Sequence, residues 1–361
     1  MASCALSAPA VEQADPRHRR GRRHHLGCII LISLCAVLAG ARSLAAIGQW
    51  AANAPQHTLA RLDARLTHPA LGLRQAPSTA TIRRVLTSTD PTLLTRMSTA
   101  ADLAVLIVDG KSARGSHTRQ SRAVHLLAAM TPAGQVAAQT RVADTTNEIS
   151  ALADLLAGLD IEGSVVSADA LHTRNETARH LVQERRAHYV FTVKANQPTL
   201  FRQIKALPWA QAPRLFTEAS RAHGREERRT VKVLTAPGLA FAHAKQVVRV
   251  HRWVKELATG KVRRTYAYVV TSLAAEQADV GRLAGLVRGH WQIEALHHVR
   301  DVSFGEDASR VRSGHGAQNM AMLRNLAIGL LAGLDRSSIP AAIRWVSYEA
   351  FTRPLDLLGL A

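Results

Sequence analysis

The middle of the chain alternates between strand-like and helix-like patterns, and this alternation restricts the fold more than any other feature. Short apolar runs bounded by turn residues are typical of strands, while apolar residues three or four positions apart are typical of helices. Thr131-Pro-Ala-Gly134 is a good hairpin turn between two of the strand-like runs. On these criteria, strands are expected at residues 104–109, 123–130, 135–142, 164–168 and 188–194, and helices at residues 147–159, 173–186 and 197–207.

The order strand-strand-strand-helix-strand-helix-strand-helix is that of an RNase H-like domain, an α/β fold in which a mixed sheet lies between helices. The pattern changes after residue 207. Residues from about 208 to 265 contain strand-like runs rich in basic side chains and are predicted to form a β-rich insertion. Residues 266–273 form one further strand-like run, and residues from 280 to about 334 are helix-like. We therefore expect one α/β domain over residues 100–361, interrupted by this insertion.

Residues 1–95 are predicted to form a separate helical domain, of which residues 1–16 carry no clear pattern and are expected to be disordered. A short helix is expected after Pro77, with Ser78 or Thr79 as its N-cap. Arg83 and Arg84 on its exposed side would suit phosphate contacts, as in a helix-turn-helix module. An ordinary surface helix explains the same residues equally well.

The N-terminal region also resembles a secretory signal, because the basic residues 17–25 precede an apolar run from Leu26 to Ala41. The run is shorter than the roughly 20 residues that a membrane span needs. The helical apolar pattern continues through Trp50 without a cleavage-like break. We favour a buried helix of a DNA-binding domain with a basic arm in front of it.

Three acidic residues lie in three different segments. Asp109 and Asp169 each end an apolar strand-like run, and Glu294 lies within the helix-like residues 288–301. Two strand-end aspartates and a helix glutamate can hold a pair of hard divalent cations through oxygen ligands. Two such cations can stabilise both the attacking and the leaving oxygen of a phosphodiester. The three carboxylates therefore indicate metal-dependent chemistry on a phosphodiester.

The net charge points to the same class of substrate. The chain of 361 residues has 46 Lys and Arg against 27 Asp and Glu, a formal net charge of +19. Such an excess favours a polyanionic partner through phosphate contacts and counterion release. A basic surface without a specific partner is the alternative. Only three cysteines occur, with no Cys-x-x-Cys pair, which argues against a disulfide framework and suits a reducing compartment.

An ordered set of short motifs adds a family resemblance. The motifs include Val108-Asp-Gly-Lys111, Asn147-Glu148, Ala168-Asp-Ala-Leu-His-Thr173, Val193-Lys-Ala-Asn-Gln-Pro198, His223-Gly-Arg-Glu226, Arg288-Gly-His-Trp-Gln-Ile-Glu294 and Asp301-Val-Ser-Phe-Gly-Glu-Asp307. With them, the chain resembles bacterial insertion-sequence transposases of the ISAs1 type, within the IS4-like group of DDE transposases. The resemblance extends over nearly the whole chain.

The resemblance implies a function and a site. It implies that Asp109, Asp169 and Glu294 form the catalytic triad and hold two Mg²⁺ ions, for which Mn²⁺ can substitute. It implies hydrolysis at transposon ends, followed by attack of the freed 3′-hydroxyl on target DNA. The partners would be terminal inverted repeats, target DNA and a second copy of the chain in a homodimer. A membrane would not be a partner, and the protein would act in the bacterial cytoplasm, associated with the nucleoid.

Several residues near the three acids match family motifs and are candidate DNA contacts. For each of them, a solvated loop or a supporting role is as credible as a direct contact. Asp301 stands where the wider IS4-like signature has Lys, and we interpret it as a salt-bridging helix residue. The candidate contacts, besides Arg83 and Arg84, are Lys111, Arg114, His172, Lys194, Asn196, Gln197, His290 and His298.

Alternatives remain for the site and for the function. His290, Glu294 and His298 are spaced four residues apart and would share one face of a continuous helix, an arrangement that could also bind zinc. We prefer one carboxylate ligand flanked by two DNA-contacting imidazoles.

An RNase H-like nuclease that cuts without joining strands, or a DNA-binding protein without catalysis, would retain much of the same pattern.

Overall fold

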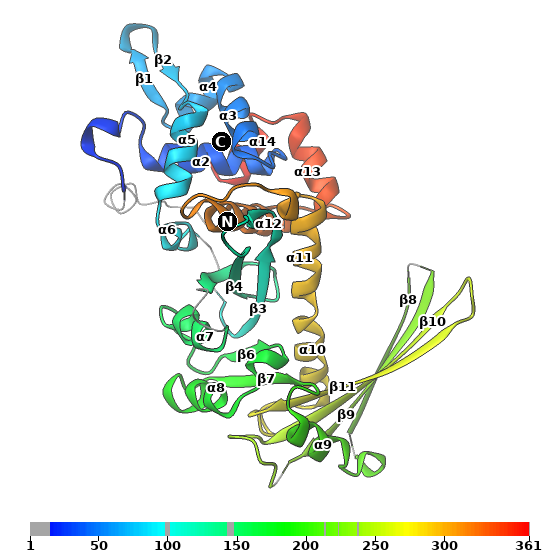
Figure 1. The fold of residues 1–361 in the computed structure, drawn as a ribbon. Helices are drawn as coiled ribbons and strands as arrows, with labels where there is room; N and C mark the ends of the chain where they lie inside the picture. The colour runs from blue at the N-terminus through cyan, green and yellow to red at the C-terminus, as the bar shows by residue number, and fades with distance from the viewer. Residues whose placement is uncertain are drawn as a thin grey trace. The chain divides into compact units, whose positions relative to one another are not determined.

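The structure is a computed structural model that describes residues 15–97, 102–142, 148–212, 214–222, 224–236 and 238–360 (Figure 1). The chain divides into two compact units, each assembled from separate segments. Unit 1 comprises Met1–Ala101, Gly110–Asn147 and Glu294–Ala361. Unit 2 comprises Asp102–Asp109 and Glu148–Ile293. The chain therefore passes from unit 2 into unit 1 directly after Asp109 and again directly before Glu294.

One large mixed sheet contains most of the described strands. Its order is β5-β4-β3-β6-β7-β11-β10-β9-β8, with β6 parallel to both β3 and β7. Helices flank this sheet, so the predicted α/β class is confirmed, and the arrangement of the first five strands is consistent with an RNase H-like fold (Figure 1). The strands are β3 (Val105–Ala113), β4 (Val124–Met130), β5 (Val136–Val142), β6 (Val165–Ala168), β7 (His188–Val193), β8 (Arg214–Ala222), β9 (Arg225–Thr235), β10 (Gln246–Glu256) and β11 (Val262–Thr271).

The first strand is longer than its apolar run predicted. We expected a polar loop from residue 110, but β3 continues to Ala113 and is followed by a 3₁₀ turn at Arg114–Ser116. The polar side chains of the added residues have partners there. Ser112 is hydrogen-bonded to the ring of His125 on β4 at 2.9 Å, and Lys111 forms an ion pair with Asp301. Because these partners are distant in sequence, hydrophobic periodicity could not predict the extension.

Unit 2 combines helices with strands rich in valine. The helices are α7 (Glu148–Leu156), α8 (Asn175–Arg179), which continues as a π-helical turn at His180–Glu184, α9 (Pro198–Lys205) and α10 (Val280–His290). Of these, α9 and α10 contact strands of the sheet. One core cluster joins valines of β9, β10 and β11 to Leu283, Leu286 and Val287 of α10. Branched side chains suit a pleated surface that is buried on one side, so α10 covers this face of the sheet.

The predicted β-rich insertion is an extension of the sheet. Its strands β8 to β11 pair antiparallel in succession, and β11 pairs antiparallel with β7 from Tyr268↔Val193 to Thr271↔Val190. The insertion therefore adds four strands beyond β7 and does not fold as a separate β-domain. Its last strand, β11, continues past residue 265 to Thr271 and so includes most of the further strand expected at residues 266–273.

Unit 1 contains the N-terminal and C-terminal helices in one core. The buried helix α12 packs against α2, α5 and α6, although more than two hundred residues separate it from them in sequence. Asn319 of α12 donates two hydrogen bonds, to the carbonyl oxygens of Leu86 and Thr89. The helices are α2 (Leu26–Leu38), α3 (Leu44–Asn53), α4 (Gln56–Arg61), α5 (Thr79–Ser88), α6 (Pro91–Thr95), α12 (Gly316–Ala332), α13 (Ile339–Tyr348) and α14 (Arg353–Leu357).

The apolar run near the N-terminus forms the buried helix α2. All of its residues except Gly27 and Leu31 are buried, and α3, α5, α12, α13 and α14 pack against it. A helix that is apolar all round is expected where other helices surround it. The interpretation of residues 26–38 as a buried helix is therefore confirmed. No helix within the described residues is both long enough and apolar enough to cross a membrane.

The segment before α2 is held by a local ion pair. Residues 1–14 of the segment expected to be disordered lie outside the described residues, whereas Asp15 is described and buried. Arg17 donates to the Asp15 carboxylate at 2.6 Å and to the carbonyl oxygen of His24 at 2.7 Å. Burial would raise the pKa of Asp15, but its hydrogen bonds and ion pairs with Arg17 outweigh burial and lower it. Part of the predicted basic arm is thus neutralised locally.

A short hairpin interrupts the N-terminal helices. Helices were expected to about residue 66, followed by a breaker region at residues 67–72. Instead, β1 (Arg65–His68) pairs antiparallel with β2 (Leu73–Gln75). Gly72 turns the chain between them with φ at 64°, a left-handed conformation that glycine adopts without a steric penalty.

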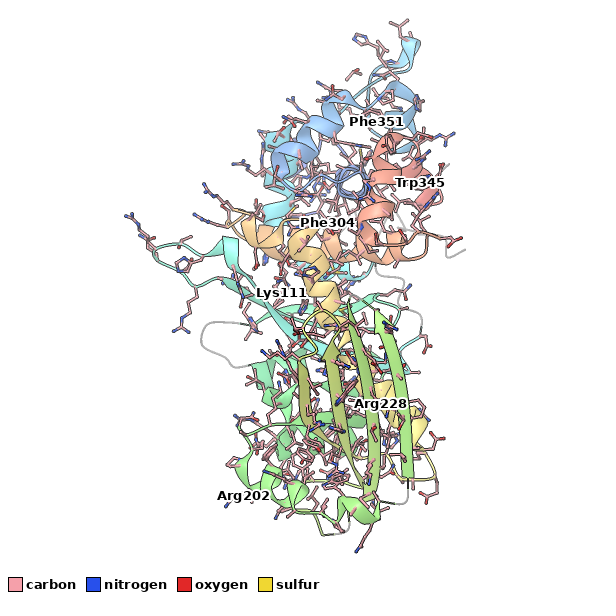
Figure 2. The ribbon with its side chains drawn as sticks, turned by 90° about the vertical axis from the view of Figure 1, so that its right-hand side faces the viewer. Lys111, Arg202, Arg228, Phe304, Trp345 and Phe351 are labelled. Atoms are coloured by element: carbon pink, nitrogen blue, oxygen red, sulfur yellow. The ribbon has the colours of Figure 1, made fainter. Side chains whose placement is uncertain are left out.

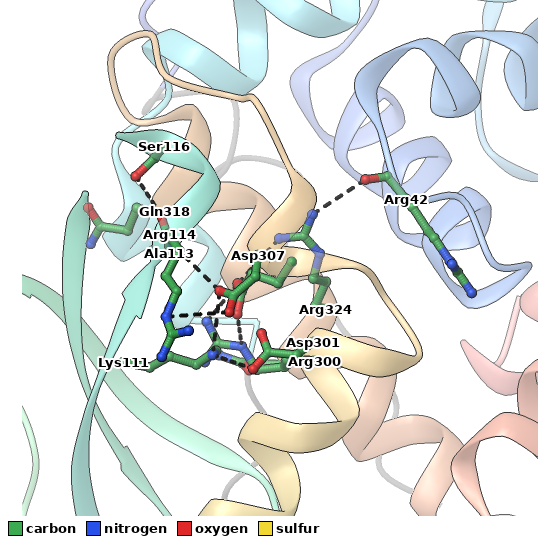
Figure 3. A network of polar contacts seen from close by, with 12 residues as sticks. Arg42, Lys111, Ala113, Arg114, Ser116, Arg300, Asp301, Asp307, Gln318 and Arg324 are labelled. Carbon is green, nitrogen blue, oxygen red and sulfur yellow. Dashed lines mark hydrogen bonds and ion pairs between the residues drawn. The ribbon is translucent and has the colours of Figure 1, made fainter. Parts of the chain in front are cut away.

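A helix break and a buried charge cluster characterise the segment around Glu294. The helix-like stretch 288–301 is interrupted, since α10 ends at His290, Trp291 forms a turn, and α11 begins at Gln292 (Gln292–Val302). Beyond α11, Glu306 accepts hydrogen bonds from Arg300 at 2.7 and 2.8 Å and from Arg324 at 3.3 Å. All three side chains are at most 2% exposed. This cluster joins the end of α11 to α12, and Figure 3 labels its two arginines, Arg300 and Arg324.

Replacing Glu306 by Gln should destabilise the protein strongly. The substitution keeps the side-chain shape but leaves the guanidinium groups of Arg300 and Arg324 buried without a compensating anion. Removing one member of a buried ion pair typically lowers stability by about 3–5 kcal/mol. Urea denaturation at neutral pH measures this change. Glu349→Gln, which breaks an exposed pair with Arg353, is the control and should lower stability by less than about 1 kcal/mol. Equal losses in the two variants would contradict the assigned role of Glu306.

Candidate active site

Asp109 and Asp169 follow the last paired residues of two neighbouring parallel strands. The pairing of β3 with β6 runs from Val105↔Val165 to Val108↔Ala168. The two aspartates are the next residues on the two strands, and adjacent strands lie about 4.8 Å apart. Both strands are buried up to this point. The register therefore brings two carboxylates together at the carboxyl end of the sheet in unit 2.

The Asp169 carboxylate is held in its ionised form. Burial alone would raise its pKa, but a hydrogen bond from the backbone N–H of Ala170 and a charge-assisted bond from Lys194 outweigh this effect and lower the pKa. The Lys194 ammonium lies 2.9 Å from the carboxylate oxygen. Lys194 follows β7, the strand next to β6. Asp109 thus follows the last residue of β3 that pairs with β6, while Asp169 and Lys194 directly follow the adjacent strands β6 and β7.

Asn196 and Gln197 complete the loop after β7. The amide of Asn196 donates to the carbonyl oxygen of Ala170 at 2.9 Å, which connects the loop after β7 to the loop after β6. Gln197 occupies the N-cap position of α9 without a side-chain capping bond. The Lys194 and Asn196 side chains are exposed and Gln197 is half-buried. The predicted motif Val193–Pro198 therefore forms a loop beside Asp169.

Two histidines lie close to Asp169 inside unit 2. His172 is 1% exposed and His290 is 8% exposed. Burial lowers the pKa of His290, although the nearby Asp169 charge acts in the opposite direction. His290 is consequently neutral at neutral pH. Because both imidazoles are buried, a direct contact of either one with DNA would require a rearrangement of unit 2.

The predicted helix face of His290, Glu294 and His298 does not form. The turn at Trp291 separates His290 from the other two residues, and His290 is buried whereas Glu294 and His298 are exposed. Glu294 lies in the first turn of α11, one helical turn before His298. The expectation of one continuous helix was therefore wrong, while Glu294 and His298 still share a face of α11.

Lys111 is tied to carboxylates in unit 1 (Figure 3). Its ammonium donates to Asp301 of α11 at 2.8 Å and lies 3.8 Å from Asp307. Arg114 lies 3.7 Å from Asp307 and is largely exposed. The interpretation of Asp301 as a salt-bridging residue is thus confirmed. Lys111 follows Asp109 by two positions on β3, and Asp301 follows Glu294 by seven positions on α11, so one ion pair joins the strand and the helix that carry two of the predicted catalytic acids.

Arg83 and Arg84 are placed as the helix pattern predicted. Both are exposed on α5, whose apolar face buries Ile82, Val85 and Leu86. The side chain of Ser78 accepts a hydrogen bond from the N–H of Thr81 at 3.2 Å, so Ser78 is the N-cap. This geometry leaves both guanidinium groups accessible on unit 1.

The two aspartates fit a divalent cation by their chemistry. Carboxylate oxygens at a strand edge are the donors that hard divalent cations prefer, and the lowered pKa of Asp169 keeps one donor deprotonated at neutral pH. Among the described residues, no three Asp, Glu, His or Cys side chains meet as a metal-binding group. The third predicted ligand, Glu294, belongs to unit 1.

Comparison with known proteins shows the family. The protein-family model described as DDE_Tnp_1-associated matches residues 12–100, and the family model described as Transposase DDE domain matches residues 100–330. The chain belongs to the DDE transposases. The transposase is of the IS4-like type, as the sequence motifs predicted. Members of the family generally use divalent metal ions, which agrees with the donor chemistry of the aspartate pair.

Relatives in bacteria support this assignment. The transposase is 27% identical over 344 residues to "Putative transposase YncI" of Escherichia coli O157:H7, which covers 88% of this chain and 84% of the relative. It is 27% identical over 354 residues to "H repeat-associated putative transposase YhhI" of E. coli K12, covering 89% and 90%. "Putative protein YbfL" of E. coli K12 is 30% identical over 268 residues, covering 67% and 69%.

Replacing Lys194 by Met should raise the pKa of Asp169. The pKa of this carboxyl in the folded protein lies below its ordinary value. The Asp169 carboxylate therefore stabilises the fold when the pH is above the ordinary pKa, and this contribution is lost as the pH falls to the lowered pKa. Without the ammonium, this contribution is smaller and is already lost completely at a higher pH. NMR titration of carboxyl-labelled aspartates measures the shift. Lys205→Met, which removes an exposed cation from α9 of the same unit, should leave Asp169 unchanged. An unchanged titration in Lys194→Met would exclude the proposed electrostatic coupling.

Proposed function

We propose that this transposase hydrolyses DNA at transposon ends and then joins the freed 3′-hydroxyl to target DNA, with Asp109, Asp169 and Glu294 as its catalytic acids. The observation that carries the proposal is the pair of aspartates that follow parallel β3 and β6. The resemblance of its motifs to ISAs1-type transposases supports the assignment of Glu294 as the third acid. These three residues would hold Mg²⁺, two ions in the active complex, with Mn²⁺ able to substitute.

The bound ions would supply charge stabilisation for the attacking and leaving oxygens of the phosphodiester. Asp169 is suited to bind a cation because it is already ionised and releases no proton on binding. Lys194 balances its charge until then and, with its ammonium exposed, could turn to a DNA phosphate. His290 is neutral, so it adds no positive charge that would compete for the carboxylates.

Two exchanges of phosphodiester bonds account for the reaction. In the first, a water oxygen attacks phosphorus at the transposon end, the bond from phosphorus to the 3′-oxygen breaks, and a 3′-hydroxyl is released. In the second, this hydroxyl oxygen attacks a phosphorus of target DNA and displaces the 3′-oxygen there. Each step forms one phosphorus–oxygen bond and breaks one. No covalent link between protein and DNA is required, so no Ser or Tyr nucleophile is assigned.

The remaining candidate residues divide by exposure. The residues enclosed by protein, His172, His290 and Lys111, would support the site, whereas the exposed side chains and the half-buried Gln197 would contact DNA directly. A homodimer would bring two transposon ends together at the terminal inverted repeats. We place the reaction in the bacterial cytoplasm at the nucleoid. The proposed direct contacts are Arg83, Arg84, Arg114, Lys194, Asn196, Gln197 and His298.

Asp109→Ala, Asp169→Ala and Glu294→Ala should each abolish Mg²⁺-dependent cleavage while DNA binding persists. Each substitution removes a proposed metal ligand but no basic residue. Cleavage and joining are measured on supercoiled plasmid that carries the terminal repeats, and binding by gel shift. Glu276→Ala, an exposed acid of unit 2, is the control and should keep full activity.

Other outcomes of the cleavage, joining and binding assays would contradict different parts of the proposal. Cleavage that persists in any of the three variants removes that residue from the metal site. Nicking without joining by the unmodified protein would indicate a nuclease and contradict strand transfer. Binding without any cleavage, in the presence of Mg²⁺ or Mn²⁺, would indicate a DNA-binding protein that has lost catalysis.

A further inference from the structure

The sheet extension β8–β11 has two faces with different charge patterns. Side chains alternate between the two faces along each strand, so the pairing register assigns every residue of the four strands to a face. Arg228, Trp253 and Arg264 are direct partners on β9, β10 and β11, so they share one face. This face is called the outer face here, and the opposite one, which α10 covers in part, is called the inner face.

The inner face is apolar near α10, and farther out its arginines are interleaved with three glutamates, Glu218, Glu227 and Glu256. Val231, Val248 and Val269 pack there against α10. Its acidic residues are all paired with arginines. Glu227 binds Arg229 at 2.5 Å and Arg252 at 2.7 Å, Glu256 binds Arg263 at 3.2 Å, and Glu218 binds Arg288. These hydrogen bonds lower the pKa of Glu227, with the bond from Arg252 as the largest cause.

The outer face has a large excess of positive charge. Its one acidic residue, Glu226, lies directly between Arg221 on β8 and Lys255 on β10. Arg221, Arg228 and Arg264 are exposed, and none of them forms an ion pair with a carboxylate within the described residues. Figure 2 shows Arg228 on this sheet. The basic residues of the outer face are Arg221, Arg228, Lys232, Arg249, Lys255 and Arg264.

Aromatic side chains lie among these cations. Trp253 stands between Arg228 and Arg264. Tyr266, which is 56% exposed, stacks on His251 with ring centroids 4.7 Å apart. The guanidinium of Arg249 lies over the ring of Tyr266, 5.6 Å from its centroid. The stacking and cation–π contacts fix Tyr266 against its neighbours on the outer face.

The base of the outer face is covered by the protein itself. Phe201 of α9 packs edge-on against Tyr268, and Trp209 lies near the same ring. Lys232 donates to the carbonyl oxygen of Trp209 at 2.7 Å. The uncovered part therefore begins beyond Tyr268 and Lys232 and extends over the rows that contain Tyr266, Arg228 and Arg264.

We infer that the outer face of β8–β11 binds the phosphate backbone of duplex DNA, as a contact surface separate from the carboxylate site. Duplex DNA carries one negative charge per about 1.7 Å of its axis. This matches the uncovered rows of the outer face, where one anion, Glu226, is accompanied by four cations, Arg221, Arg228, Lys255 and Arg264. Arg228 and Arg264 lie two strand spacings apart, about 10 Å, so their mutual repulsion would be relieved by phosphates lying across the strands. A protein partner would need an equally dense acidic surface. The inference rests on DNA as the partner of the family and not on the assignment of the triad.

Adjacent arginines on β11 provide a matched test. Arg264 lies on the outer face and Arg263 on the inner face, and both are exposed. Duplex DNA of random sequence is titrated with the full-length protein at several salt concentrations. Each lost phosphate contact lowers the slope of log K against log salt by about 0.9. Arg264→Gln should therefore reduce the slope by about 0.9, Arg228→Gln/Arg264→Gln by about 1.8, and Arg263→Gln should leave it unchanged.

The outcomes separate this inference from the proposed catalytic function. Substitutions on the outer face should weaken DNA binding but leave the cleavage rate at saturating DNA unchanged. Substitutions of Asp109, Asp169 or Glu294 should abolish cleavage but leave DNA binding unchanged. Equal slope changes in Arg263→Gln and Arg264→Gln, or none in the double variant, would overturn the inference. The inference would also be overturned if the double variant had a changed sedimentation coefficient but an unaltered affinity for DNA. The outer face would then contact a second copy of the chain. Thermal unfolding checks that all variants are folded.

Discussion

The parallel pairing of β3 with β6 is the constraint on which the account of this molecule depends. Parallel neighbours end at the same edge, so residues that follow them in sequence come together however far apart they are in the chain. Asp109 and Asp169 are sixty positions apart and become neighbours through this register. A shift of one residue in either strand would turn its aspartate to the other face of the sheet. The valine-rich pairing before the aspartates therefore determines the chemistry at the strand ends.

Local patterns predicted much of the fold. The apolar runs gave β4, β5, β6 and β7 to within one or two residues, and the apolar N-terminal run gave the buried helix α2. Two aspartates at strand ends could also be identified, because a carboxylate directly after a buried strand has few structural roles. These features depend on residues close in sequence, and periodicity detects them.

Other features depend on partners distant in sequence and could not be predicted. Nothing local indicates that α12 packs against α2, or that Glu306 is buried between two arginines. A charged side chain rarely lies in a core, so the sequence does not mark Glu306 as a buried residue. The break at Trp291 also escaped detection, since both flanking segments have helical patterns. For the candidate site, the sequence indicated the residues, while the structure showed that Lys111 and His172 are enclosed by protein.

The charge of the sheet extension illustrates the same distinction. Composition predicted a polyanionic partner, and the insertion was seen to be basic, but the two faces are separated only by strand register. Register places Arg263 beside Glu256 and leaves Arg264 on the side with few acids. The net charge of +19 is therefore unevenly distributed, and one surface combines cations and aromatic rings as nucleic-acid-binding surfaces do.

The central claim is that Asp109 and Asp169 bind the same divalent cation. The most direct measurement is an anomalous-difference map from crystals of the protein grown with Mn²⁺. The account predicts a peak about 2.1–2.3 Å from a carboxylate oxygen of each aspartate, distances typical of hard divalent cations with oxygen ligands. Ordered density for both side chains with no manganese between them, at a concentration that supports DNA cleavage, would contradict it.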